Sequence, residues 1–167
     1  DALSADVMRL HLQTPRSNRL RFLAGQSVAL SVGDDASDYA VASCPCDDRN
    51  LQFHVRAIEG NTFAKRVFGG LRSGETVNVY GPVGDFVLNQ KSARPILLLA
   101  CNSGFAPIKS LAEHAVSLGL AESVHLCWLA TVDKGHYLSN WCRAWADALD
   151  GFNYTELFAR SLDDPRL

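Results

Sequence analysis

The sequence predicts a two-domain chain, with an antiparallel β-barrel at residues 1–90 followed by a truncated α/β domain with a parallel sheet at residues 91–167. Apolar and polar residues alternate with a period of two from Asp6 to about Leu88, as they do in strands with one buried face. Turn signals interrupt this alternation at short intervals, which is typical of a small barrel. After Gln90, apolar runs alternate with stretches of helical period, which indicates a parallel sheet with helical connections.

The composition is that of a globular protein and excludes several function classes. Hydrophobic residues make up 47% of the 167 positions and charged residues 20%, which leaves enough apolar surface for a core. The net charge of −2 offers no basic surface for nucleic acid, and no apolar run approaches the roughly 20 residues that span a bilayer. Because the sequence begins at Asp1 rather than Met, we expect a piece of a longer chain.

The five cysteines follow neither a disulfide nor a metal framework. We expect reduced thiols in a cytoplasmic protein, because the number is odd and the spacing is irregular. Cys44 and Cys46 are the only close pair, and no second Cys or His pair stands at ligand spacing. We therefore expect no metal or iron–sulfur cluster on this chain.

Alternating segments define the strands expected in the barrel domain. Each segment buries every second residue and turns the residues between them to water. In the segment at residues 51–56, His54 and Arg56 alternate with the apolar residues and are therefore expected on the outward face. The apolar members are Met8, Leu10, Leu12, Val28, Leu30, Val32, Leu51, Phe53, Val55, Val77 and Val79.

One helix, at residues 59–70, interrupts these strands. Thr62 is its expected N-cap, and Gly69-Gly70 can end it. Such a helix often plugs the end of a barrel, and that structural role stands beside a binding role. The entry at 60–62 exposes N–H groups suited to an anion. The apolar face consists of Phe63, Val67 and Phe68.

A continuous apolar run at residues 95–100 opens the α/β domain and predicts a parallel strand covered on both sides. A small-residue turn follows at 102–104, and Pro107 suits the first turn of the next helix. Lys109 and Glu113 are expected as an exposed pair on that helix. Its buried face is expected at Ile108, Leu111, Ala112, Ala115 and Leu118. The remaining elements are a strand at 124–130, a helix at 139–149 and a strand at 152–158.

Four segments, taken in order, resemble the ferredoxin–NADP reductase superfamily, with the flavin reductase and oxygenase-reductase branch as the most similar. They are DYAVASCP (38–45), EGNTF (59–63), VYGPVGDFVL (79–88) and LLACNSGFAPIKS (98–110). A fifth segment, HLCWLATVDKGHYL (125–138), is similar to the part of the family that contacts the adenosine half of the nucleotide. The resemblance covers nearly the whole chain and implies a flavin-binding barrel followed by a nucleotide-binding domain.

The resemblance implies a flavin site on the barrel domain. Tyr39 corresponds to the aromatic residue that packs on the flavin ring, and residues 60–62 correspond to the pyrophosphate turn. Arg56 corresponds to a strand that faces the ribityl and phosphate arm, although a solvated outward side chain is an equal alternative. The residues implied to bind flavin are Tyr39, Ala40, Val41, Ser43, His54, Val55, Arg56, Gly60, Asn61 and Thr62.

The flavin site departs from the family pattern at two important positions. The family's arginine, which neutralises the flavin phosphate, falls at Ser37, and its serine near flavin N5 falls at Ala40. A charge-assisted phosphate contact contributes ~1.5–3 kcal/mol, so its loss weakens flavin binding unless Arg56 or another basic residue substitutes. The Ser/Thr of the pyrophosphate turn is Phe63, next to Thr62.

The resemblance also implies a nicotinamide site at the strand end of the α/β domain, where Ser103 works with Tyr39 to align the two rings. The family's paired glycines fall at Cys101 and Asn102, and asparagine tolerates left-handed backbone angles better than cysteine does. Thr131 replaces an arginine that often recognises a ribose phosphate, which favours NADH over NADPH without deciding between them. The residues implied to bind the nucleotide are Asn102, Ser103, Gly104, Ala106 and Pro107.

Three functions follow from the resemblance. The first is a flavin-dependent NAD(P)H oxidoreductase that passes hydride to FAD, with FMN as the alternative, and then electrons to an iron–sulfur protein or domain. The second is a relay subunit that holds flavin but accepts no nicotinamide, and the third is a non-enzymatic descendant. A hydrolase is disfavoured because the sequence has no G-x-S-x-G elbow and its five histidines have no metal spacing.

Overall fold

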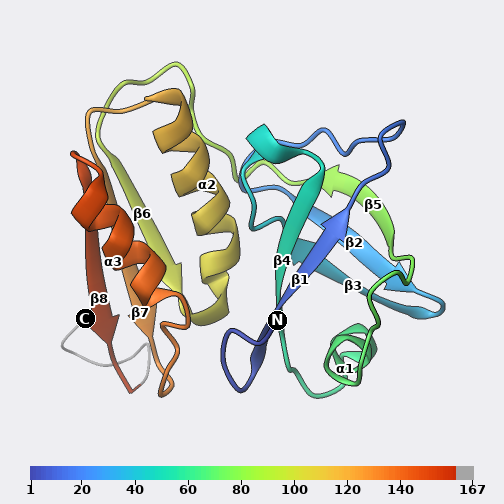
Figure 1. Cartoon of the computed structure of the whole chain (residues 1–167). Coiled ribbons are helices and arrows are strands. Elements are labelled where there is room, and N and C mark those ends of the chain that lie inside the picture. The colour runs from blue at the N-terminus through green and yellow to red at the C-terminus, as the bar shows by residue number, and fades with distance from the viewer. Residues whose placement is uncertain (161–167) are drawn as a thin grey trace.

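The computed structural model describes residues 1–160, which form two domains packed side by side (Figure 1). The first domain contains β1 (Val7–Gln13), β2 (Ser27–Val32), β3 (Asp35–Ala40), η1 (Pro45–Asp47), β4 (Asn50–Arg56), α1 (Thr62–Phe68) and β5 (Asn78–Val83). The second contains β6 (Ile96–Cys101), η2 (Asn102–Gly104), α2 (Phe105–Leu118), β7 (Val124–Ala130), α3 (Ser139–Ala148) and β8 (Phe152–Phe158). The predicted order of elements is therefore confirmed.

The first domain is built from two antiparallel sheets around one core. β1 pairs with β4, and β2 lies between β3 and β5; these pairings do not join into a closed hydrogen-bonded ring within residues 1–160. The predicted burial of alternate residues is confirmed in β4, where every second residue from Leu51 to Val55 is fully buried. The core consists of Phe22, Val28, Leu30, Val41, Leu51, Phe53, Val55, Phe63, Ala64 and Val67.

α1 contributes to this core, so its expected packing role is confirmed. Phe63 and Val67 are buried on one face of the helix, which ends at Gly69 as predicted. The N-cap is Asn61 and not Thr62: the Asn61 Oδ1 atom accepts the Ala64 N–H at 2.8 Å. An asparagine oxygen reaches this N–H as readily as a threonine hydroxyl does, and the cap lies one residue earlier than the pattern suggested.

The second domain is a parallel sheet in the order β6-β7-β8, with both helices on the same face (Figure 1). Right-handed crossovers that always step in the same direction along a sheet place their helices on one side. The expectation that β6 is covered on both faces is therefore wrong for residues 1–160. Leu98 is buried beneath the helices, whereas Leu97 and Leu99 on the other face are 61% and 67% exposed.

α2 is packed on two sides, because it lies between its own sheet and the first domain (Figure 1). The prediction of an exposed Lys109–Glu113 pair is wrong: the Lys109 side chain is 7% exposed and lies 2.6 Å from the Glu113 carboxylate. The Lys109 Nζ also donates to the Ala42 carbonyl at 3.3 Å. Ile108, Leu111, Ala112 and Ala115 are buried as predicted, whereas Leu118, at the end of the helix, is exposed.

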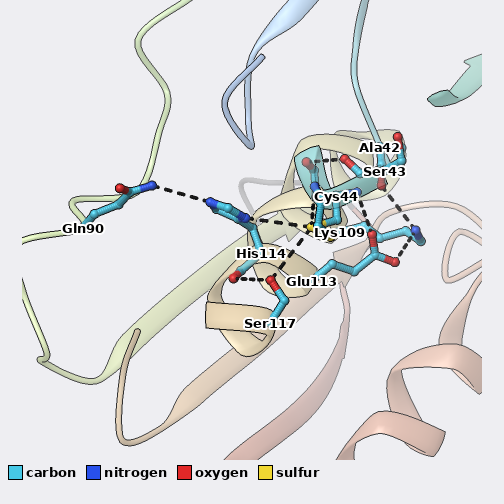
Figure 2. Close-up of a disulfide and its surroundings, with 10 residues drawn as sticks. Ala42, Ser43, Cys44, Gln90, Lys109, Glu113, His114 and Ser117 are labelled. Atoms are coloured by element: carbon cyan, nitrogen blue, oxygen red, sulfur yellow. Dashed lines mark hydrogen bonds and ion pairs between the residues drawn. A yellow bond between two sulfur atoms is a disulfide. The ribbon is translucent and has the colours of Figure 1, made fainter. Parts of the chain in front are cut away.

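The expectation of reduced thiols is wrong for Cys44 and Cys46, which form a disulfide in the β3–β4 connection (Figure 2). The η1 turn brings their Cα atoms to 5.1 Å, which is within the range that a disulfide bridges. The Cys44 N–H donates to Glu113 on α2 at 3.0 Å. Cys101, Cys127 and Cys142 have free thiols.

None of the helices between residues 1 and 160 combines the length and the apolar character that crossing a membrane requires.

Candidate functional site

A neutral polar cluster joins β3 to the start of α1. Because side chains alternate along a strand, Ser37 and Tyr39 share one face of β3 and point toward α1. The Asn61 amide donates to the Ser37 hydroxyl at 3.1 Å and to the Tyr39 oxygen at 3.2 Å. The Tyr39 ring is half-buried and lies 5.4 Å from the Phe63 ring between centroids. The cluster therefore offers a tyrosine ring and uncharged hydrogen-bonding groups side by side.

The Tyr39 phenol is neutral in this setting. Burial raises the pKa of Tyr39, and its hydrogen bonds with Asn61 and Ser37 offset only part of that rise. The adjoining turn is open to solvent: Gly60, with φ of 83°, and Thr62 are both exposed. The predicted site residues Tyr39, Gly60, Asn61 and Thr62 are thus brought together, and Ala40 follows Tyr39 on the same strand.

Arg56, at the end of β4, is committed to an ion pair. Its Nε atom lies 3.2 Å from the Asp6 carboxylate, and its side chain is 34% exposed. Whether Arg56 faces a flavin phosphate or is a solvated outward side chain stays a prediction. Three further residues on the flavin list, Val41, Ser43 and Val55, are buried, so their side chains belong to the core. Any ligand contact at these three positions would be made by backbone atoms.

His54 is buried and not outward-facing, which corrects the alternation argument for this residue. It is only 5% exposed because α2 and the segment after β7 cover this part of β4. Its Nδ1 atom lies 3.0 Å from the Tyr137 hydroxyl, and its Nε2 atom has no hydrogen-bond partner among residues 1–160. Burial lowers the pKa of His54 to about 3, with Lys109 and Arg9 adding to the effect, so the ring is neutral near pH 7.

The turn between β6 and α2 is fixed by Asn102. Its φ is 47°, so asparagine occupies the left-handed region as predicted, whereas Cys101 is extended with φ of −130°. The Asn102 side chain accepts the Thr131 N–H at 2.9 Å and donates to the Thr131 hydroxyl at 2.8 Å. The Asn102 carbonyl accepts the Trp128 indole N–H at 3.0 Å. Two adjacent strand ends are therefore tied together at the edge where open α/β sheets bind ligands.

The predicted nucleotide residues divide into an accessible and a buried group. Ser103 is half-buried and Gly104 is exposed on the turn, whereas Ala106 is buried in the first turn of α2. Because α2 begins at Phe105, Pro107 lies in its first turn as predicted. Ser103 and Gly104 are thus the members of this group that a ligand can reach most directly.

The seam between the two domains brings the strands of the flavin list against α2. Figure 2 shows Ala42, Ser43 and Cys44 facing Lys109 and Glu113. The Ser110 hydroxyl donates to the Ser43 carbonyl at 2.7 Å. Further along the seam, the His54 and Phe105 rings are stacked with centroids 6.2 Å apart, so packed rings fill the seam at that point. The facing arrangement of Tyr39 and Ser103 across the seam stays a prediction.

Sequence reasoning missed two contributors to this seam, Tyr137 and Ser110. Tyr137 lies in the segment similar to the family's adenosine contacts, but nothing in the local pattern pointed to His54. Ser110 stands among apolar residues of α2, where a buried serine leaves no periodic signal. A cavity of about 1210 Å³ lies elsewhere, between β1, β5 and their loops, and none of the predicted site residues lines it.

Comparison with known proteins identifies the first domain. Residues 1–88 match the oxidoreductase FAD-binding domain family, and the chain belongs to this family. It is 31% identical to the reductase component 2 of terephthalate 1,2-dioxygenase from Comamonas sp, over 89% of this chain and 44% of that relative. It is 30% identical to the NAD(P)H-flavin reductase of Vibrio harveyi, over 71% of this chain and 51% of that relative.

The fold comparison agrees with this family. A ferredoxin NADP+ reductase from Neisseria gonorrhoeae, solved with FAD and NADP, superposes with a TM-score of 0.80 at 18% identity, over 96% of this chain and 65% of that one. At this identity the likeness shows the fold alone. The chain spans about half the length of the two relatives named above.

The residues of the polar cluster suit the neutral parts of a flavin. A half-buried tyrosine ring offers a packing surface, and the Ser37, Tyr39 and Asn61 groups offer uncharged hydrogen-bond partners. The donor set therefore fits the flavin ring and its ribityl chain.

Proposed function

We propose that this chain is the flavin-binding part, together with the beginning of the nucleotide-binding part, of an NAD(P)H-dependent flavoprotein reductase. The membership of residues 1–88 in the FAD-binding family carries this proposal. The Asn102 turn at the end of the first parallel strand supports a nucleotide site beside it. FAD is the expected flavin, and NADH or NADPH is the co-substrate.

The flavin supplies the redox chemistry when bound, accepting a hydride and releasing electrons singly. The protein's task is to hold and orient the two ligands. Asn61 donates to the Tyr39 hydroxyl and so holds the ring on which a flavin would pack. The Asn102–Thr131 bonds fix the turn that presents Ser103 and Gly104. The Lys109–Glu113 pair and Ser110 hold α2 against the flavin domain. The distance between the flavin site at Tyr39 and the nucleotide site at Ser103 is therefore kept constant.

The electron acceptor in this proposal is an iron–sulfur protein or domain. The support is the resemblance of the ordered segments to the ferredoxin–NADP reductase superfamily, together with the name of the Comamonas relative, a reductase component of a dioxygenase. A cytoplasmic location is also part of the proposal, and the free thiols of Cys101, Cys127 and Cys142 support it. The Cys44–Cys46 disulfide argues in the other direction, so thiol labelling of freshly lysed cells is the relevant measurement.

A flavin-holding relay module is the second candidate, and one observation favours it. The family's paired glycines at the nucleotide turn are replaced by Cys101 and Asn102, and the Asn102 side chain is held by Thr131 through one amide N–H and the amide oxygen, so side chains stand where the family has none. Such a module would exchange electrons with partners without accepting hydride.

Two measurements on the purified chain test the proposal. Titration with FAD at equilibrium, followed by flavin fluorescence, should show saturable binding. Anaerobic mixing of the protein and excess FAD with NADH or NADPH in a stopped-flow instrument should then bleach the flavin absorbance. A bound flavin that neither nucleotide bleaches would favour the relay module, and absence of any FAD binding at equilibrium would contradict both functions.

A further inference from the structure

The polar groups beside Tyr39 are already committed to one another. Asn61 gives its amide N–H groups to Ser37 and Tyr39, and its amide oxygen to the Ala64 N–H. The amide that caps α1 is therefore not free to bind an anion. α1 is also short, with only seven residues, so its dipole and free N–H groups make a weak anion site.

The arginines at the end of β4 and on α1 are each engaged in a solvent-exposed ion pair. Arg56 lies 3.2 Å from the Asp6 carboxylate, and Arg66 lies 2.9 Å from the Glu75 carboxylate. Lys65 is exposed on α1, and Glu59, of opposite charge, is exposed just before the turn. A phosphate group placed here would meet neutral partners, paired guanidinium groups and the exposed Lys65, whose attraction at a solvated surface is weak and screened by salt.

We propose, on the basis of the proposed function, that this chain holds flavin through its ring and ribityl chain and gains little from the phosphates. Charge-assisted hydrogen bonds are the strong contacts to phosphate, and the cluster of Ser37, Tyr39 and Asn61 supplies none. The site therefore takes riboflavin, FMN and FAD with similar affinity. Flavin then behaves as an exchangeable ligand rather than as a permanently held group.

The first test is a fluorescence titration of the whole chain with riboflavin, FMN and FAD, at low and at high salt. The three dissociation constants should agree within about threefold. Salt should change them little, because salt screens contacts between charges and not the neutral contacts on which binding depends here. Binding of FMN or FAD about tenfold or more tighter than riboflavin would overturn the inference while leaving the proposed function intact. Absence of binding by all three flavins would contradict the proposed function itself.

The second test introduces the missing charge. Ser37→Arg places a guanidinium beside Asn61, and it should tighten FMN and FAD about tenfold while changing riboflavin by less than about threefold. Ser17→Arg is the matched control, because it makes the same change on an exposed loop. Circular dichroism reports whether both variants fold. If a folded Ser37→Arg tightens all three flavins equally, or none of them, the placement of the phosphate beside Ser37 is wrong.

Discussion

The molecule contains two polar networks of opposite character. One, formed by Ser37, Tyr39 and Asn61, is neutral, half-buried and open on one side. The other, formed by Lys109 and Glu113 at the seam, is charged and mostly buried, and Lys109 also donates to the Ala42 carbonyl. Buried charges demand full pairing, whereas half-exposed neutral groups can exchange protein partners for a ligand. The contrast separates the groups that hold the domains together from those that can receive flavin.

The largest expected effect comes from breaking the seam network. Lys109→Met should lower the free energy of unfolding by up to about 3 kcal/mol, because it leaves the Glu113 carboxylate, 19% exposed, with the Cys44 N–H but without its charged partner. The double variant Lys109→Met/Glu113→Gln should lose less, since no unpaired charge remains. Denaturant unfolding measures both, with the exposed Lys65→Met as control. Equal losses in the Lys109 and Lys65 variants would show that the seam pair contributes nothing.

The second effect concerns His54, which lies beside this seam. Its pKa of about 3 is below the ordinary 6.5, so the unfolded chain binds the proton more readily between these values. The contribution of neutral His54 to the free energy of unfolding is therefore complete above pH 6.5. The free energy of unfolding falls by up to ~1.4 kcal/mol per pH unit as the pH drops from 6.5 toward 3. Unfolding followed between pH 7 and 5 checks this, and His54→Leu should flatten that dependence. A profile identical in the variant and the parent would refute the assignment to His54.

The third effect separates stability from binding in the neutral network. Asn61→Ala removes the cap of α1 and should cost ~1 kcal/mol of stability. It also removes one of the neutral hydrogen-bonding groups beside the Tyr39 ring, so the affinity for flavin should fall as well. Asn61→Asp keeps a capping oxygen and is the matched control for the helix. If both variants bind flavin with the affinity of the parent, the neutral network does not receive flavin.

The smallest effect is expected from Tyr39→Phe. The hydroxyl is half-buried and accepts one bond from Asn61, so its loss should change stability by about 0.5–1.5 kcal/mol at most. The ring remains, and flavin affinity should stay within about threefold of the parent, because packing on the ring carries the contact. Fluorescence titration measures the affinity, and a larger loss would mean that the hydroxyl itself binds flavin.

The sequence predicted the elements well because their signals are local. Alternation located β1, β2 and β4, and the helical period located α2 and α3, where Trp141 and Trp145 pack against each other. It also predicted the left-handed Asn102. It did not predict the burial of His54 and Lys109, since each is covered by a segment distant in the sequence. Similarly, the open face at Leu97 and Leu99 follows from the direction of the crossovers, which periodicity does not encode.

The candidate site was predicted through its resemblance to a family more than through physical pattern. Tyr39 and Asn61 do meet, but the Asn61 bond to Ser37 was not foreseen, because neither residue carries a periodic or charged signal. Val41 and Val55 were placed at the site by their strands, and burial shows that their side chains serve the core.

The central claim is that flavin binds at Tyr39 rather than in the cavity of about 1210 Å³, which Tyr80 lines. The most direct measurement is a flavin titration of Tyr39→Ala beside Tyr80→Ala, which removes an exposed tyrosine of β5. The account predicts that Tyr39→Ala weakens binding about tenfold or more while Tyr80→Ala leaves it unchanged. The reverse pattern would place the flavin in the cavity and contradict the account.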